Sequence, residues 1–242
     1  QHRNLESHPR LGRIYRIKYR KTPRGVKPAM LGKKPGELVA ILAHSNGWWR
    51  DMAQQLIIDA GDDSVVPALI ALAGDHSQPL GQIHALWTLE GLGRINLAAI
   101  KAAMASEDPY VLESVIRLAE LLPSIDHVKA ISILERLAAN PDLVVQRQLA
   151  GSLGRFPSVD ALVLLKKVLL NNIEVPFVRE LAISGLEGRE LIFRETLGEG
   201  FRDEKFLGYL KHCMTPKTTA SAFKAPRNKE HRESFHRAKH HP

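Results

Sequence analysis

The 242-residue sequence lacks several features on which common protein classes depend. A single cysteine, Cys213, excludes a disulfide framework, a cysteine-rich zinc site and a covalently attached c-type haem within this chain. The longest apolar runs, such as residues 161–165, are far shorter than the roughly 20 residues of a membrane-spanning helix. The first 35 residues also lack the apolar stretch of a signal peptide. What is present, 44% hydrophobic and 25% charged residues, is ordinary globular composition that can bury a core.

The positive charge of the chain is confined to its two ends. Residues 1–35 hold eleven Lys and Arg against one acid, and residues 215–242 hold seven against two. Residues 36–214 hold 16 basic and 23 acidic residues, a net charge of −7. A folded nucleic-acid-binding protein usually carries its positive field on the folded body. The charge pattern therefore disfavours, without excluding, nucleic-acid binding by the middle of the chain.

The middle of the chain repeats. Five segments can be aligned on an anchor residue: Trp49, Gly81, Val111, Val145 and Val178. The anchors are 32, 30, 34 and 33 residues apart. Each is followed, four and eight positions later, by apolar residues on the same helical face. Each segment follows another helical run, at residues 37–42, 65–72, 98–104, 130–137 and 161–169. Helix pairs at this spacing predict an all-α fold, an α-solenoid of about five HEAT-like pairs. A non-repeating helical bundle is the alternative.

The flanking segments differ from the repeats. Residues 12–19 alternate in polarity like a short β-strand, and a linker rich in Pro and Gly follows them. We therefore divide the chain into a basic amino-terminal segment (residues 1–35), the repeats (36–190), closing helices (191–214) and a basic tail (215–242). The tail has few large apolar residues and is predicted to be disordered.

Three runs of sequence resemble a known bacterial family. The run GRIYRI at residues 12–17 resembles the last strand of glucose/sorbosone dehydrogenase-like β-propellers. The runs ELVAILAHSNGWWRD (residues 37–51) and HALWTLEGL (residues 84–92) resemble the HEAT-like repeats that follow this propeller in large membrane-bound dehydrogenases of planctomycetes and their relatives. The resemblance covers about residues 10–190.

This resemblance implies a scaffold and a location. In that family the propeller precedes the repeats and a c-type cytochrome commonly follows them, so this module would hold the two together in the periplasm or cell envelope. The dehydrogenase and haem residues of the family have no counterparts here, so we expect no cofactor, no metal and no catalysis. The alternatives are a HEAT-like solenoid that binds nucleic acid, as DNA glycosylases of this kind do, and an enzyme that works through a tryptophan-lined groove.

The candidate partner-binding residues lie on the second helices of the first two pairs. They comprise all three tryptophans of the chain and their polar neighbours: Trp48, Trp49, Arg50, His84, Trp87 and Glu90. Adjacent tryptophans on a helix point about 100° apart, so one is expected to pack and the other to anchor a partner. Packing between repeats is the competing explanation for the whole set.

Other motifs have ordinary structural explanations. The glycines of residues 91–94 follow a helix rather than a strand, which indicates a helix end and not a phosphate loop. Residues 212–214 (His-Cys-Met) are consecutive and cannot easily converge on one metal ion. Four histidines of the tail are expected to be solvated. Residues 62–63 and 203–204 are acidic pairs at predicted helix starts, where carboxylates suit the helix dipole.

Overall fold

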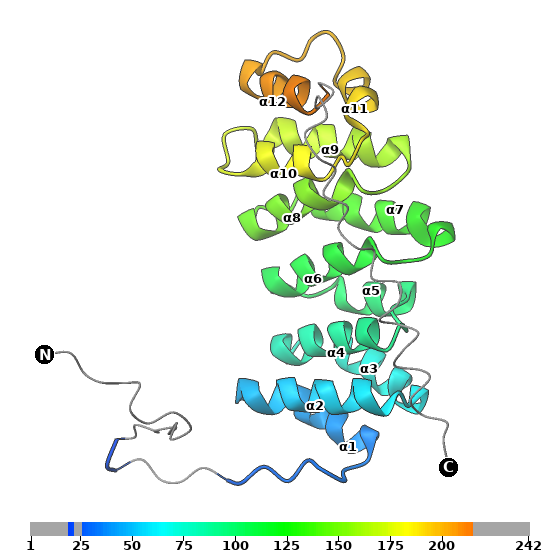
Figure 1. Cartoon of the computed structure of the whole chain (residues 1–242), viewed down its shortest axis with the longest axis vertical. Helices are drawn as coiled ribbons and strands as arrows, with labels where there is room; N and C mark the ends of the chain where they lie inside the picture. Colours follow the sequence, from blue (N-terminus) through cyan, green and yellow to red (C-terminus); the bar gives the residue numbers. More distant parts are fainter. Residues whose placement is uncertain (1–18, 22–25, 215–242) are drawn as a thin grey trace, which may run out of the picture.

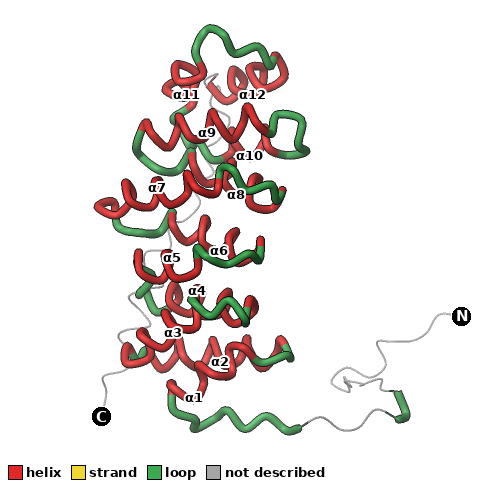
Figure 2. The backbone as a smooth tube through the Cα atoms, turned by 180° about the vertical axis from the view of Figure 1, so that it is seen from behind, coloured by secondary structure: helices red, strands yellow, loops and turns green. Residues whose placement is uncertain are grey.

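The computed structural model describes residues 19–21 and 26–214, and in this part of the chain every regular element is a helix. Figure 1 shows the helices stacked in two columns, and Figure 2 shows the same stack from behind, with helices and loops and no strand among the described residues. The all-α solenoid predicted from the repeats is confirmed. The strand predicted at residues 12–19 and the tail at 215–242 lie outside the described residues, apart from Tyr19.

Six helix pairs follow one another within residues 26–214. In order, the pairs are α1 (Pro35–Val39) and η1 (Ala40–Ala43) with α2 (Gly47–Ala60); η2 (Asp63–Val65) and α3 (Val66–Ala73) with α4 (Pro79–Gly91); α5 (Leu97–Ala103) with α6 (Pro109–Ala119); η3 (Ser124–Asp126) and α7 (His127–Leu137) with α8 (Leu143–Leu153); α9 (Val159–Asn171) with α10 (Val178–Ser184); and α11 (Glu190–Leu197) with α12 (Glu204–Met214). The first five match the five repeats. The closing helices of residues 191–214 form a sixth pair.

The second helices α2, α6 and α8 begin at capping residues that the sequence supplies. The Asp108 carboxylate accepts hydrogen bonds from the backbone N–H groups of Tyr110 and Val111 at the start of α6. Asp142 and Asn46 cap α8 and α2 in the same way. Such caps satisfy backbone donors that have no partner inside the helix. They fix where these three helices start, and hence which residues occupy their first turns.

Buried glutamines tie the two helices of a pair together. Gln82 follows the anchor of α4 and donates to the carbonyl of Ala73 at the end of α3, at 2.7 Å. Gln146 holds the same position in α8 and donates to the carbonyl of Leu137 at the end of α7, at 3.1 Å. Helix ends leave carbonyls unpaired, so each amide satisfies a group that would otherwise be buried without a partner.

The second helices of neighbouring pairs stack directly on one another. The anchors Val111, Val145 and Val178 are fully buried. Between α8 and α10 the backbones approach so closely that a Cβ added at Gly185 would lie 2.4 Å from the carbonyl oxygen of Gly151. Only glycine permits this approach. The core is therefore a continuous apolar seam between the two columns, and the outer sides of the second helices form one long face.

Candidate protein-interaction surface

The outer sides of α2, α4, α6, α8 and α10 form the second-helix face. Its helices run side by side, and the contacts between them join residues whose positions relative to their anchors differ by about one helical turn. The Trp87 indole N–H of α4 donates to the Ser114 hydroxyl of α6 at 3.3 Å. The Arg147 guanidinium of α8 donates to the carbonyl of Pro176, just before α10, at 3.1 Å. Successive second helices are therefore neighbours on this face, with side chains meeting across them within about one turn of equivalent positions.

The adjacent tryptophans at the start of α2 have different environments. Trp48 is 52% exposed. Trp49 packs against the core and its ring stacks on His44, with centroids 4.6 Å apart. Arg50 donates to the carbonyl of His44 at 2.7 Å and so holds the loop that precedes the helix. Of these candidates, Trp48 is the one whose side chain is mostly available to a partner.

The candidates on α4 are partly committed to contacts between helices. His84 Nδ1 lies 2.7 Å from the Gln54 side-chain oxygen of α2, and burial lowers the pKa of its imidazole, with the positive charge of Arg50 acting in the same direction. Trp87 is half-buried against the core. Glu90 is half-buried near the end of α4. The structure thus brings the candidates onto two adjacent helices, and their role in binding stays a prediction.

A groove further along the same face was not foreseen from the sequence. It crosses α6, α8 and α10, has a volume of about 500 Å³ and includes apolar, acidic and basic walls: Tyr110, Glu113, Arg117, Val144, Arg147, Gln148, Gly151, Arg155, Leu181 and Ser184. Burial raises the pKa of the Glu113 carboxyl. Gly151 contributes no side chain, which leaves space in the middle of the groove.

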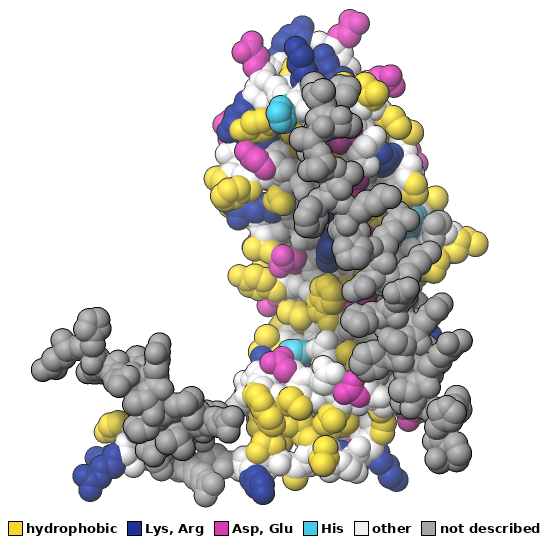
Figure 3. Space-filling model, in the orientation of Figure 1, with side chains coloured by type: hydrophobic (Ala, Val, Ile, Leu, Met, Phe, Trp, Pro, Cys, Tyr) yellow, Lys and Arg dark blue, Asp and Glu magenta, His cyan; other side chains and the backbone are white. Residues whose placement is uncertain are grey.

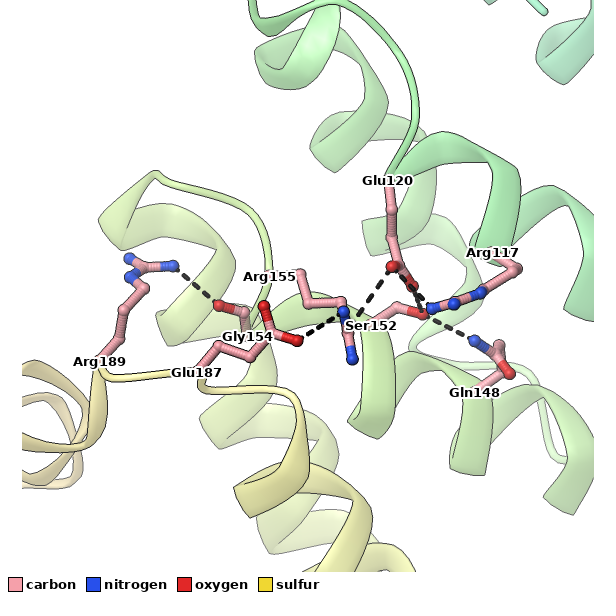
Figure 4. Close-up of polar contacts among 8 residues, drawn as sticks. All are labelled: Arg117, Glu120, Gln148, Ser152, Gly154, Arg155, Glu187 and Arg189. Carbon is pink, nitrogen blue, oxygen red and sulfur yellow. Dashed lines mark hydrogen bonds and ion pairs between the residues drawn. The ribbon is translucent and has the colours of Figure 1, made fainter. Parts of the chain in front are cut away.

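Charged residues at one end of the groove are paired with one another (Figure 4). The Glu120 carboxylate is only 8% exposed and lies 2.8 Å from the Arg117 guanidinium and 3.6 Å from that of Arg155. It also accepts a hydrogen bond from Ser152, and Arg155 pairs with Glu187 at 2.7 Å. This network joins α6, α8 and the residues after α10. This network stabilises the packing between repeats. Of the three arginines that line the groove, Arg147 is the one that forms no ion pair among the described residues.

The remaining motifs have the structural roles expected of them, as far as they are described. Gly93 ends α4 with a positive φ of 68°, and Arg94 pairs with Asp63 at 2.7 Å. Asp203 accepts a hydrogen bond from the Phe206 N–H at the start of α12. Cys213 is exposed. Among the described residues, no group of three or more His, Cys, Asp or Glu side chains is placed to hold a metal ion.

Comparisons with known proteins identify part of the chain. Residues 96–187 match the family model of HEAT repeats. This region is HEAT-like. The match begins at the residue before α5 and ends just after α10, so it covers the third, fourth and fifth pairs and includes the groove. No curated protein and no solved structure matches the chain.

The first two helix pairs and the sixth lie outside that match. All three tryptophans belong to the first two pairs, and so do the other candidate residues predicted from the sequence. HEAT repeats build extended surfaces that commonly mediate protein interactions, so the described part of the chain is a repeat scaffold. In the same part, no helix is long and apolar enough to cross a membrane.

Proposed function

We propose that this chain is a non-catalytic protein-interaction scaffold, the HEAT-like module of a dehydrogenase–cytochrome electron-transfer assembly. One observation carries the proposal: Trp48 exposes half of its large apolar side chain at the first turn of α2, in the first pair of the stack. Burial of a partly exposed tryptophan by a partner is typical of an interface hot spot. Because Trp48 belongs to the first helix pair, it would lie near a domain that precedes the repeats and could contact that domain.

The nature of the partner is proposed from the sequence resemblance. The runs at residues 12–17, 37–51 and 84–92 support a dehydrogenase-like β-propeller on the amino-terminal side. A c-type cytochrome is the second proposed partner, and the periplasm or cell envelope is the proposed location. In this arrangement the repeats would set the distance between two redox proteins and carry no redox group themselves.

The charges of the folded body do not favour nucleic acid as the ligand. Residues 36–214 carry a net charge of −7. Two of the groove arginines, Arg117 and Arg155, are paired with carboxylates. Because the affinity of proteins for duplex DNA depends on unpaired cations that contact phosphates, we expect weak binding by this surface.

The proposal is tested by replacing Trp48 in the full chain and measuring affinity for a purified propeller and a purified c-type cytochrome by calorimetry. Trp48→Ala is expected to weaken one of these complexes by about 2 kcal/mol, while the melting temperature stays nearly constant. Leu170→Ala is the control, since Leu170 is similarly exposed (50%) but lies on α9, in the first-helix column. Unchanged affinity for both proteins in the Trp48 variant would contradict the proposal.

A further inference from the structure

The groove across α6, α8 and α10 has more positive than negative side chains in its lining. Three arginines line it, and the one carboxyl group in the lining is that of Glu113. The surrounding body, residues 36–214, has a net charge of −7. Over these three helices Figure 3 shows hydrophobic, basic and acidic side chains side by side. The positive charge of the groove is therefore local and does not belong to a broad basic surface.

Two of the three arginines are already paired with carboxylates. Glu120 holds both Arg117 and Arg155, and Glu187 holds Arg155 as well. Arg147 has no carboxylate partner among the described residues, and its side chain is half-buried. The unpaired positive charge of the groove thus belongs to Arg147.

The remaining carboxyl groups beside the groove are held by backbone groups or have a raised pKa. Asp108 and Asp142 border the groove where α6 and α8 begin, and both accept hydrogen bonds from backbone N–H groups. Burial raises the pKa of the Glu113 carboxyl, which favours its neutral form. Glu113 therefore repels an incoming anion less than an exposed glutamate would.

The guanidinium of Arg147 is held in position by the neighbouring repeat. Its Nε–H donates to the carbonyl of Pro176 at 3.1 Å, and this bond uses one of its five N–H groups. The N–H groups on Nη1 and Nη2 form no hydrogen bond within the described part of the chain. Together they have the planar geometry that suits a carboxylate. Because the side chain is already positioned, less conformational entropy is lost when a ligand binds.

Space for a ligand side chain lies beside this guanidinium. Gly151 follows Arg147 by four residues, so it lies on the same face of α8. A Cβ at Gly151 would meet only Leu181, at 3.7 Å, which is an ordinary contact. Leu181, Tyr110 and Val144 supply the apolar part of the lining. The groove therefore combines one unpaired cation with apolar walls from three helices.

We propose that the groove binds a short linear segment of a partner protein that pairs one carboxylate with Arg147 and packs apolar side chains on Tyr110, Val144 and Leu181. Recognition of acidic motifs by arginines is a common mode of peptide binding, and arginine is frequent among interface hot spots. This inference rests on the scaffold function proposed above and adds a second binding site with the chemical class of its ligand.

The same charges favour a single carboxylate over a nucleic acid. Duplex DNA carries one negative charge about every 1.7 Å along its axis. A polyanion laid across the groove would bring further charges against Asp108, Asp142 and Glu187, which border it. A segment with one carboxylate between uncharged residues avoids this repulsion.

The probe is a peptide with blocked ends and the sequence Gly-Ser-Gly-Leu-Ser-Glu-Ser-Leu-Gly-Ser-Gly. In an extended chain its glutamate and both leucines lie on one side. The control peptide has glutamine in place of glutamate. Affinity for the full chain is measured by amide NMR titration in about 50 mM and 300 mM salt. We expect the glutamate peptide to bind about fivefold to tenfold more tightly at low salt, with a smaller ratio at high salt.

Charge variants show whether Arg147 is the anchor. Arg147→Gln is expected to remove the preference for glutamate over glutamine. Arg136→Gln removes the same charge from an exposed arginine of α7 and should leave the preference unchanged. Glu113→Gln removes the negative charge from the lining and is expected to strengthen binding of the glutamate peptide about twofold to threefold. A gain in affinity cannot result from unfolding.

A steric variant tests the space in the groove. Gly151→Ala is expected to weaken binding of the glutamate peptide about threefold, because the new methyl group occupies part of the groove. The melting temperature should rise, because the methyl group makes only ordinary contacts and alanine favours the helix more than glycine does. This loss of affinity would therefore not reflect a loss of structure.

Three results would overturn the inference: equal affinity of the parent chain for both peptides, an unchanged preference in Arg147→Gln, or weaker binding in Glu113→Gln. Tighter binding of a DNA duplex than of the glutamate peptide would also overturn it, as would binding only of a peptide with phosphoserine in place of glutamate. If these results occur while the complex that depends on Trp48 still forms, the groove inference fails and the proposed function stands. If the glutamate peptide binds through Arg147 but neither redox protein binds, the reverse holds.

Discussion

The first two helix pairs and the three HEAT-like pairs that follow them are joined in different ways. In the first two pairs, α2 and α4 are linked by the half-buried contact of Gln54 with His84, and the ion pair of Asp63 in η2 with Arg94 after α4 is exposed by 56% and 50%. Between α6, α8 and α10 the links centre on the Glu120 carboxylate, which is 8% exposed, and glycines bring the backbones of α8 and the end of α10 together. In the three HEAT-like pairs, Glu120 and the glycines thus serve the packing between neighbouring helices. Of the three tryptophans in the first two pairs, Trp49 and Trp87 pack against the core and Trp48 is exposed.

The largest expected difference between the two regions concerns glycine. In Gly185→Ala the new Cβ would lie 2.4 Å from a backbone oxygen of Gly151, which cannot move without shifting α8. We expect a loss of about 3 kcal/mol in the free energy of unfolding, measured by urea denaturation. In Gly91→Ala the new Cβ would meet side-chain atoms of Ile58, Cδ1 at 2.4 Å and Cγ1 at 3.0 Å, and no backbone atom, so the side chain can move aside. This matched variant should change stability by less than about 1 kcal/mol.

A large loss in Gly91→Ala, equal to that in Gly185→Ala, would contradict the distinction between the two joints. It would mean that the first two pairs are packed as rigidly as the HEAT-like pairs.

The next effect concerns the charged links. Glu120→Ala removes a carboxylate that is 8% exposed and leaves Arg117 and the Ser152 hydroxyl without their acceptor. We expect a loss of about 2 kcal/mol in the free energy of unfolding. Asp63→Ala removes the exposed partner of Arg94 and should cost less than about 1 kcal/mol. Equal losses in the two variants, or a smaller loss for Glu120, would refute this ranking.

The smallest effect is a pH dependence in the joint of the first two pairs. Burial lowers the pKa of His84 below its ordinary value of 6.5, and Arg50 adds to the shift while Asp51 opposes it. The unfolded chain therefore takes up a proton at this residue before the folded chain does. The contribution of His84 to stability is fully present above about pH 6.5 and is lost as the pH falls through the lowered pKa.

This dependence is measured by urea denaturation at about pH 7.5 and pH 5.5. The decrease in stability between these values should be smaller in His84→Gln than in the parent chain. His212→Gln, which changes an exposed histidine of α12, should leave the decrease unchanged. A decrease of the same size in His84→Gln and the parent would show that His84 does not contribute.

Much of the fold was predictable because helical burial follows a local rule. The anchors and the residues four and eight positions later identify one face of each second helix, and capping residues such as Asp108 mark its start. The same local geometry predicted that Trp48 and Trp49 would have different environments, as they do. The sixth pair was less evident, because α11 and α12 follow the pattern only loosely.

The groove and the network around Glu120 were not predictable in this way. Glu120 and Ser152 are 32 residues apart, and neither has a local sequence signal that distinguishes it from an ordinary surface residue. Their contact depends on the distance and rotation between α6 and α8.

The sequence by itself therefore determined the helix pairs, their number in the HEAT-like part and the inward face of each second helix, because these depend on residues within two or three turns of one another. Only the tertiary structure decided which remaining side chains meet across neighbouring pairs. Gly151 and Gly185 show the reason: their close approach depends on how two helices 34 residues apart are rotated and spaced, and that is set by the packing of the whole stack.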